Sequence, residues 1–201
     1  IELSCLAVVA FVIGLLIFFQ YRVYSVAYRD RLTRLHNQNF FFDKTSKSAG
    51  IRKMPQKAVS LIEIANLRQI NEYYGEETGN RVLVFVAVTL RKHLSSGAHL
   101  FRLKGDSFLL VSPYADPQVF LAFLEFLREH MRSYKGGIIS TQLDFNVGVS
   151  LTGRNVKVRE AAEQAELARR EAKGSVGHLV LFNGKMEEEL KAAKRIERNM
   201  E

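Results

Sequence analysis

The sequence predicts an α+β domain that is preceded by a single transmembrane helix. Residues 3–19 are apolar and uncharged, and a segment of ordinary globular composition follows them. In that segment, short β-branched runs alternate with stretches whose apolar residues recur at helical spacing. The order strand, helices, hairpin of strands, helix and strand matches the split β-α-β-β-α-β core of ferredoxin-like domains, with one extra helix–strand insertion.

Composition limits the class of protein. Of the 201 residues, 47% are hydrophobic and 25% are charged, which is typical of a folded globular chain. Cys5 is the single cysteine, so a disulfide framework is excluded and a reducing compartment is indicated. The net charge of +8 comes from scattered lysines and arginines, so we expect no nucleic-acid partner.

The uncharged N-terminal segment is long enough to cross a bilayer as a helix, which takes about 17–25 residues. A signal peptide would have a positive start and a small-residue cleavage site, and a buried core helix would show a polar face. Aromatic and basic residues follow, as suits a cytoplasmic interface. We therefore expect a transmembrane helix over residues 1–20, a helical connection over 21–29, and a cytoplasmic domain on a bacterial inner membrane.

The first part of the domain is expected to hold a capped helix and a buried strand. Asn37 can cap a helix that begins at Phe40–Phe42, and residues 47–57 are polar enough to form a loop. Residues 58–64 form an apolar, β-branched run that predicts a buried strand. Glu63 stands out in this strand, because a buried carboxylate is costly unless it is paired or bound to a metal.

Two helices and a hairpin come next. The helices are expected at 66–74, where Gly75 ends the first, and at 78–94. Residues 101–108 place Gly105 and Asp106 between two apolar runs, which is a hairpin signal. From this stretch alone, Asp106 is either an ordinary turn residue or a carboxylate that faces a metal ion or phosphates.

The remaining elements follow from the same patterns. In chain order we expect a loop between Pro113 and Pro117, a helix at 118–132, a break at Gly136-Gly137, a strand at 143–149, a helix at 158–173, a strand at 179–182 and a charged helix at 184–201.

Six stretches, in order and at the right spacing, resemble the motifs of GGDEF domains, the cytoplasmic modules that include diguanylate cyclases. These stretches are Asp30-x-Leu-Thr-x-Leu-x-Asn37, the run 63–75, Gly79-Asn80, the signature Phe101-Arg-Leu-Lys-Gly-Asp-Ser-Phe108, Val147-Gly148-Val149 and the run 165–173. The resemblance assigns residues 30–183 to one GGDEF domain with a nucleotide-cyclase-like fold.

The resemblance implies the chemistry of the domain. In active members two domains face each other, each holding one GTP, and two phosphoryl transfers give cyclic di-GMP, with Mg²⁺ stabilising the charge. Glu63 and Asp106 stand at the positions of the family's two metal-binding carboxylates. Lys104, Gly105, Asp106 and Ser107 form the signature set.

The resemblance also implies a nucleotide-binding set. Asn71 matches the asparagine that contacts guanine, and Asn80 replaces the aspartate that accepts hydrogen bonds from guanine's N1 and N2 donors. Lys173 matches the lysine that contacts phosphate. Asn37, in the opening motif, completes the set.

Several family contacts are missing. Lys104 stands in place of the first signature glycine, where backbone should approach phosphate closely, and Ser107 stands in place of the signature glutamate. Further departures lie at Arg34, Gln38, Leu67-Arg68, Gly177 and Ser95–Ala98, the last standing where a product-inhibition motif would lie. Because each lost charged contact is worth about 1.5–3 kcal/mol, we expect little turnover.

Three functions follow as alternatives. The first is a degenerate GGDEF domain that binds GTP and regulates an attached EAL phosphodiesterase domain, to which residues 184–201 would be the linker. The second is an active diguanylate cyclase, and the third is a scaffold for homodimers that binds no nucleotide. The alternative for this segment is a solvated C-terminal helix, since its acidic residues come early and its basic residues late, but we favour the linker.

Overall fold

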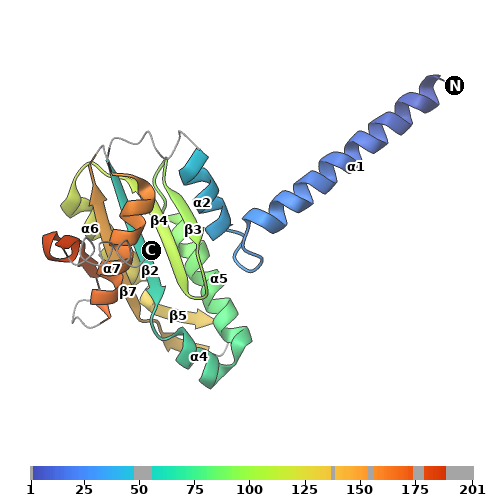
Figure 1. Ribbon diagram of the computed structural model, residues 1–201. Helices are drawn as coiled ribbons and strands as arrows, with labels where there is room; N and C mark the ends of the chain where they lie inside the picture. The colour runs from blue at the N-terminus through green and yellow to red at the C-terminus, as the bar shows by residue number, and fades with distance from the viewer. Residues whose placement is uncertain (1, 48–55, 137–138, 154–155, 174–178, 189–201) are drawn as a thin grey trace, which may run out of the picture.

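A six-stranded sheet forms the centre of the fold (Figure 1). The computed structural model describes residues 2–47, 56–136, 139–153, 156–173 and 179–188. Across the sheet, the strands are β1 (His36–Asn37), β3 (His99–Arg102), β4 (Ser107–Pro113), β2 (Lys57–Ile64), β7 (Phe145–Thr152) and β8 (Leu179–Leu181).

The four strands β3-β4-β2-β7 form the predicted split core. Each neighbouring pair is antiparallel, and β2 lies between β4 and β7 although it comes first along the chain. The helices that connect these strands are α4 (Leu67–Tyr74), α5 (Glu76–Lys92) and α6 (Pro117–Arg132). The extra helix and strand are α7 (Val158–Ala172) and β8, which pairs parallel to β7. The predicted fold class is confirmed.

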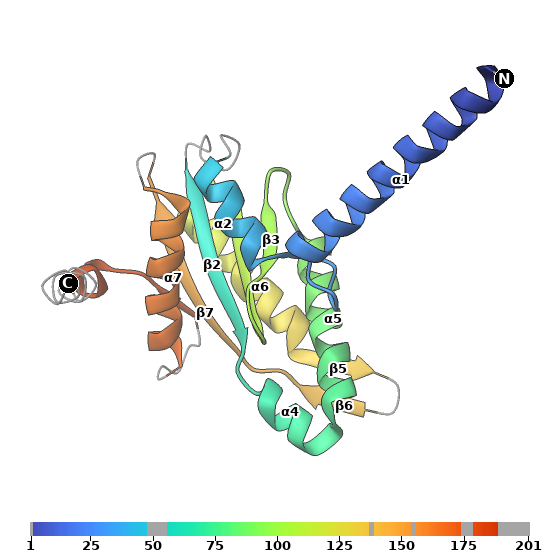
Figure 2. The same cartoon turned by 45° about the vertical axis from the view of Figure 1, so that its right-hand side comes forward.

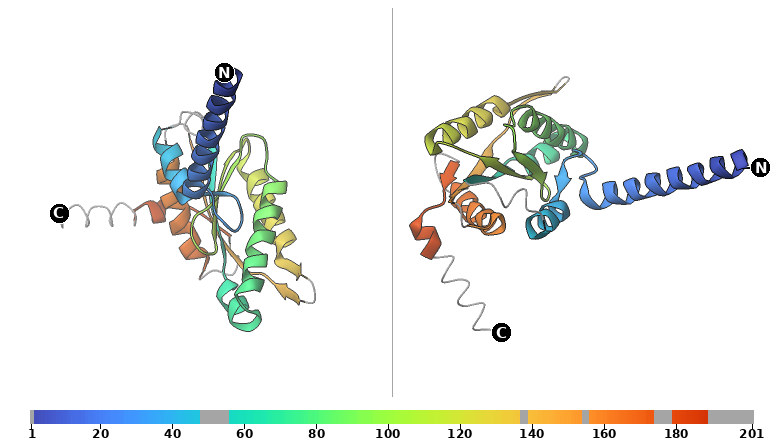
Figure 3. Two further views of the ribbon diagram at one scale, coloured as in Figure 1. Left: turned by 90° about the vertical axis from the view of Figure 1, so that its right-hand side faces the viewer. Right: turned by 90° about the horizontal axis from the view of Figure 1, so that it is seen from above.

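Helices cover both faces of the sheet (Figures 2 and 3). The larger apolar cluster packs α4, α5 and α6 against one face, with Ile62, Phe108 and Val147 contributed by the strands. The smaller cluster packs α2 (Gln38–Lys47) and α7 against the other face, around Phe101 and Leu109. Successive strand residues point to opposite faces, so a strand in a sheet covered on both sides is buried at successive positions, as β2 is along nearly all of its length.

Local signals set the helix boundaries as expected. Asn37 Oδ1 accepts a hydrogen bond from Phe40 N at 3.1 Å and caps α2. Gly75 has φ +80°, a left-handed value that a glycine adopts without strain, and it separates α4 from α5. Asp116 caps α6 through hydrogen bonds to its side chain from Gln118 N and Val119 N.

The helix α1 (Glu2–Tyr28) leads away from the domain as a long rod (Figure 1). Within Val9–Tyr28, an 18-residue window has a mean hydropathy of 1.8 and contains no buried residue. The C-terminal end of the helix packs on the domain, through Tyr24 and Tyr28 against Phe40. By length and composition this helix suits a membrane span or a signal sequence. The expected connection at 21–29 is helical but does not form a separate element, since α1 runs unbroken to Tyr28.

Some short elements escaped the sequence analysis. The strand β1 has two residues and pairs parallel with β3. The hairpin of β5 (Ser133–Gly136) and β6 (Ile139–Gln142) lies where we expected only a break at Gly136. Both strands are polar, with Tyr134 as the buried side chain of β5, so no apolar run marked them. Most of the expected loop at 47–57, and residues 189–201 of the expected C-terminal helix, lie outside the described residues; 184–188 are helical.

Candidate functional site

The predicted hairpin at 101–108 is present, and its tip is tight. Leu103 N donates to Ser107 O and Ser107 N donates to Lys104 O, both at 2.9 Å. Gly105 has φ +54°, so the turn needs a residue that tolerates the left-handed region. Lys104 is exposed at the tip.

Asp106 is held beside the end of β2. Its backbone oxygen accepts from Ile64 N at 3.2 Å, and its carboxylate accepts from the Ser107 hydroxyl at 3.1 Å. Both side chains are half-buried. Ser107 therefore contributes one hydroxyl, which is taken up by its neighbour, where the family signature would contribute a second carboxylate.

Arg102 fixes the hairpin tip to the segment that follows α1. Its guanidinium donates to Gly105 O at 2.7 and 3.2 Å and to Asp30 Oδ1 at 2.8 Å. Asp30 also accepts from the Thr33 backbone and hydroxyl, each at 2.7 Å. Burial alone would raise the pKa of Asp30, but the hydrogen bonds from Thr33 and Arg102 outweigh it and lower this pKa below its ordinary value.

Glu63 is the second-last residue of β2. It pairs with Ser107 of β4 on one side and with Asn146 of β7 on the other. Its Oε2 atom accepts from Arg169 Nη1 at 2.5 Å and from Asn146 Nδ2 at 3.0 Å. The Glu63 side chain is 19% exposed. The sequence analysis expected this carboxylate to be paired or bound to a metal, and in the structure an arginine pairs with it.

Arg169 reaches Glu63 from α7 and is shared with a second carboxylate. Its Nε and Nη2 atoms form a fork with the two oxygens of Glu166, at 2.8 and 2.9 Å. The hydrogen bonds that Arg169 donates to Glu166, together with the nearby charges, raise the pKa of the Arg169 guanidinium above its usual range. Burial would raise the pKa of Glu166, but the hydrogen bonds from Arg169 and Arg170 lower it.

These residues do not fit a divalent cation at Glu63. A Mg²⁺ ion needs free carboxylate oxygens at about 2.0–2.1 Å in octahedral geometry. Oε2 of Glu63 already accepts two hydrogen bonds, one of them from a guanidinium whose charge would repel a metal ion at the other oxygen. Within the described ranges, the structure has no cluster of three or more histidine, cysteine, aspartate or glutamate side chains that could hold a metal. The metal assignment of Glu63 and Asp106 stays a prediction, and the contacts of Glu63 argue against it.

Lys173 follows Arg169 by one helical turn at the end of α7. Its backbone N–H donates to Arg169 O at 3.3 Å, and its side chain is exposed. Since residues four apart lie on one face of a helix, Lys173 lies on the side of α7 that carries Arg169. The structure thus gathers Glu63, Asp106 and Lys173 at one end of the domain.

Asn71 of α4 and Asn80 of α5 lie near the junction of these two helices. Asn71 Oδ1 is buried, and it has no hydrogen-bond partner among the described residues. It packs directly on Gly79, where an added Cβ would collide with the Asn71 amide. Asn80 is exposed on α5 next to Gly79. The junction therefore presents two amides, one of which has an unused acceptor.

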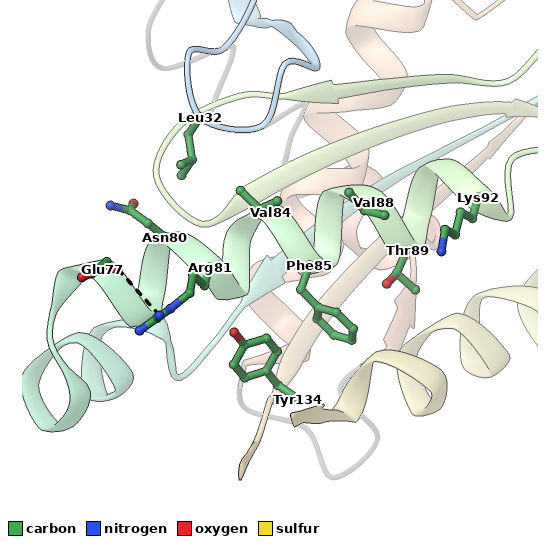
Figure 4. A pocket seen from close by; sticks show the side chains of 10 residues that line it. All are labelled: Leu32, Glu77, Asn80, Arg81, Val84, Phe85, Val88, Thr89, Lys92 and Tyr134. Carbon is green, nitrogen blue, oxygen red and sulfur yellow. Dashed lines mark ion pairs between the residues drawn. The ribbon is translucent and has the colours of Figure 1, made fainter. Parts of the chain in front are cut away.

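An open groove of about 510 Å³ begins beside Asn80 and runs along α5 (Figure 4). Leu32 and Asn80 lie near each other at one end of it, and Tyr134 of β5 borders its far wall. The lining residues are Leu32, Glu77, Asn80, Arg81, Val84, Phe85, Val88, Thr89, Lys92 and Tyr134. An apolar surface beside an exposed amide suits a planar group with polar edges.

Asn37 has a structural role in this chain. Its Oδ1 caps α2, and its Nδ2 donates to Ala27 O at 2.9 Å, near the end of α1. Both polar atoms of its side chain are thus used by the protein backbone. The assignment of Asn37 to the nucleotide-binding set stays a prediction that the geometry does not support.

Arg169 and Asn146, which both contact Glu63, were not among the residues predicted for the site. A signal for Arg169 was present: the buried residues of α7 are Val158, Ala161, Ala165, Ala168 and Ala172, and position 169 follows Ala165 by one turn. A charge beside the core-facing stripe of a helix needs a buried partner. Glu63, a carboxylate on a buried strand, was the matching partner.

Comparison with known proteins identifies relatives of this chain. The family model described as "Diguanylate cyclase, GGDEF domain" matches residues 27–177. The probable diguanylate cyclase DgcT of Escherichia coli K12 is 27% identical over 136 residues, which cover 65% of this chain and 30% of DgcT. Diguanylate cyclase TpbB of Pseudomonas aeruginosa PAO1 is 29% identical over 161 residues, covering 74% and 37% of the two chains. The chain thus spans about a third of the length of these relatives.

Solved structures share the fold. The coiled coil and GGDEF domain of DgcB from Caulobacter crescentus, in complex with c-di-GMP, superposes with a TM-score of 0.77 at 19% identity, covering 89% of this chain and 97% of that one. Diguanylate cyclase SiaD from Pseudomonas aeruginosa, in complex with its activator SiaC, gives a TM-score of 0.69 at 22% identity, covering 90% and 73%. At these identities the likeness concerns the fold.

Proposed function

This chain belongs to the GGDEF domain family of diguanylate cyclases, and we propose that it is a regulatory member that binds GTP but forms little or no cyclic di-GMP by itself. It would act at the inner face of a bacterial inner membrane, anchored by α1. Its target would be an EAL phosphodiesterase domain that follows residue 201, or a second copy of the same domain.

The proposal depends on a difference between the side of the site predicted to bind guanine and the side predicted to bind phosphate. On the guanine side, Asn71 retains a buried amide oxygen without a partner among the described residues, and Asn80 borders a groove. On the phosphate side, the signature hairpin has Lys104 exposed at its tip and Ser107 bonded to Asp106. A neutral hydroxyl cannot supply the charge of a signature carboxylate, and phosphoryl transfer depends on positioning and charge.

GTP binding is supported by the shape of the guanine side. A buried acceptor without a partner costs about 1–3 kcal/mol, and a donor from a nucleotide base would remove that cost. Gly79 leaves room for the Asn71 amide, and Leu32 offers an apolar surface beside Asn80. Lys173, exposed at the end of α7, is available to a phosphate.

An active cyclase is the alternative that a specific observation favours. Asp106 is intact and half-buried at the hairpin, and Asn71 and Lys173 keep the residue types of the family. Relatives named diguanylate cyclases share the domain. A scaffold without nucleotide is the third candidate, and it would leave the orphaned Asn71 oxygen without an explanation.

Calorimetric titration of the detergent-solubilised chain with GTP tests the proposal. We expect saturable binding that weakens at least tenfold in Asn71→Ala, because the base would lose its amide contact. Gln69→Ala is the matched control, since Gln69 is exposed on the same helix, and it should bind as the unmodified chain does. Absence of GTP binding would contradict the proposal and leave the scaffold function.

A further inference from the structure

The guanidinium of Arg169 occupies the position from which a cation would neutralise Glu63. It approaches the carboxylate from α7, 2.5 Å from Oε2, and only 13% of its side chain is exposed. Asn146 donates to the same oxygen from β7. The carboxylate thus has one charged and one neutral donor, both supplied by the chain itself.

Backbone packing holds Arg169 in this position. Strand β7 and helix α7 approach so closely at Gly148 that an added Cβ would collide with Ala165 O and with the backbone of Arg169. Ala165 and Ala168 are fully buried on the same side of the helix. Since small residues let the helix backbone lie directly on the sheet, Arg169 begins close to β2 and needs little reach to meet Glu63.

The fork to Glu166 adds a second restraint. Two nitrogens of Arg169 bond to Glu166 and the third bonds to Glu63, so all of the guanidinium's nitrogens are used. A metal ion that took Oε2 of Glu63 would displace a charged donor and leave that donor half-buried without its partner, and a metal ion at the other oxygen would lie beside the positive charge of Arg169. Breaking such a pair from one side is strongly unfavourable, and an arginine cannot relieve the repulsion by losing its proton.

We infer that Arg169 is an internal counter-ion that takes the place of a divalent cation at Glu63, so that this domain holds no metal ion at the end of β2. The inference goes beyond the proposed function, since it applies whether or not GTP binds. It also explains how Glu63 remains on a buried strand: the chain supplies the positive charge that a half-buried carboxylate needs.

Titration with Mn²⁺ alone, without nucleotide, tests this inference on the full detergent-solubilised chain. The six-line electron paramagnetic resonance signal of free Mn²⁺ reports the bound fraction. We expect no saturable binding to the unmodified chain in the submillimolar range. Arg169→Leu, which removes the guanidinium and leaves Glu63 beside Asp106, should bind Mn²⁺ at least tenfold more tightly, and Mg²⁺ should compete.

Two further variants separate this effect from a general change in charge. Arg170→Leu removes the neighbouring arginine, which also bonds to Glu166 but whose side chain is 68% exposed. It should leave Mn²⁺ binding as in the unmodified chain. In the double variant Arg169→Leu/Glu63→Gln, the gained binding should be lost.

The inference is overturned by either of two results. One is saturable submillimolar Mn²⁺ binding to the unmodified chain that Glu63→Gln abolishes, a result that does not depend on how Arg169→Leu folds. The other is a folded Arg169→Leu variant, with an unchanged circular dichroism spectrum, that binds no more Mn²⁺ than Arg170→Leu does. Because no GTP is present, neither result bears on nucleotide binding.

Discussion

Arg102 and Asp30 form an ion pair of 2.8 Å between residues that lie 72 positions apart. Arg102 is the last residue of β3, and Asp30 follows the C-terminal end of α1. The ion pair therefore connects the end of the N-terminal helix to the hairpin tip. The same guanidinium holds Gly105 O. Arg102 therefore links the residues that follow α1 directly to the signature turn.

Removing this tie should destabilise the domain. Arg102→Ala leaves Asp30 and Gly105 O without their charged donor, and the side chains of the pair are only 11% and 24% exposed. We expect a loss of about 1.5–3 kcal/mol in the free energy of unfolding, the usual range for hydrogen bonds to charged groups. Urea unfolding of the detergent-solubilised chain, followed by circular dichroism, measures it.

The matched control is Arg68→Ala. Arg68 pairs with Glu72 on the surface of α4, and its side chain is 90% exposed. The change should cost at most about 0.5 kcal/mol, as for other exposed pairs. An equal loss in the two variants would show that the Arg102 contacts contribute no more than a surface pair.

The lowered pKa of Asp30 predicts an acid-sensitive contribution to stability. A carboxyl group whose folded-state pKa is below its unfolded value, about 3.9, stabilises the fold above that value. The contribution is lost as the pH falls through the folded pKa. The melting temperature should therefore drop between pH 5 and pH 3 by more in the unmodified chain than in Asp30→Asn. Parallel pH profiles for the two chains would disprove the contribution.

The close packing of α7 on β7 at Gly148 predicts that a larger residue there destabilises the domain. Gly148→Ala would push a methyl group into the backbone of Ala165 and Arg169, which cannot move as a flexible side chain would. We expect a loss of about 1–3 kcal/mol, the usual cost of overpacking, and a weaker Glu63–Arg169 pair. Gly153→Ala is the control, because no atom lies within 4 Å of the added Cβ, and its unfolding curve should be unchanged.

The guanine side can be tested without touching either asparagine. Gly79→Ala places a methyl group against the Asn71 amide and forces that side chain to move. GTP affinity should fall at least fivefold by calorimetry, while Gly153→Ala leaves it unchanged. A Gly79→Ala chain that is folded and binds GTP normally would show that the position of the Asn71 amide is unimportant.

The sequence predicted most of the fold because its signals are local. The β-branched run of β2, the helical spacing of the apolar residues in α6 and the capping residue Asn37 each depend on neighbouring residues only. The two-residue strand β1 and the polar hairpin β5–β6 have no such signal, and tertiary pairing alone defines them.

The site was predicted less completely, for a physical reason. Residue types identified Glu63 as a carboxylate that needs a partner, but that partner is 106 positions away on α7. Its identity depends on how closely the helix approaches the sheet at Gly148. For Asn37, the family motif predicted a nucleotide contact, but both polar atoms of its side chain form hydrogen bonds with the surrounding backbone.

The central claim is that this GGDEF domain binds GTP and has lost its turnover. The most direct test is to incubate the purified chain with GTP and Mg²⁺ and to quantify cyclic di-GMP by chromatography, alongside calorimetric binding on the same sample. We predict saturable GTP binding without steady formation of cyclic di-GMP. Steady formation of cyclic di-GMP that Asp106→Ala abolishes would contradict the account and establish an active cyclase.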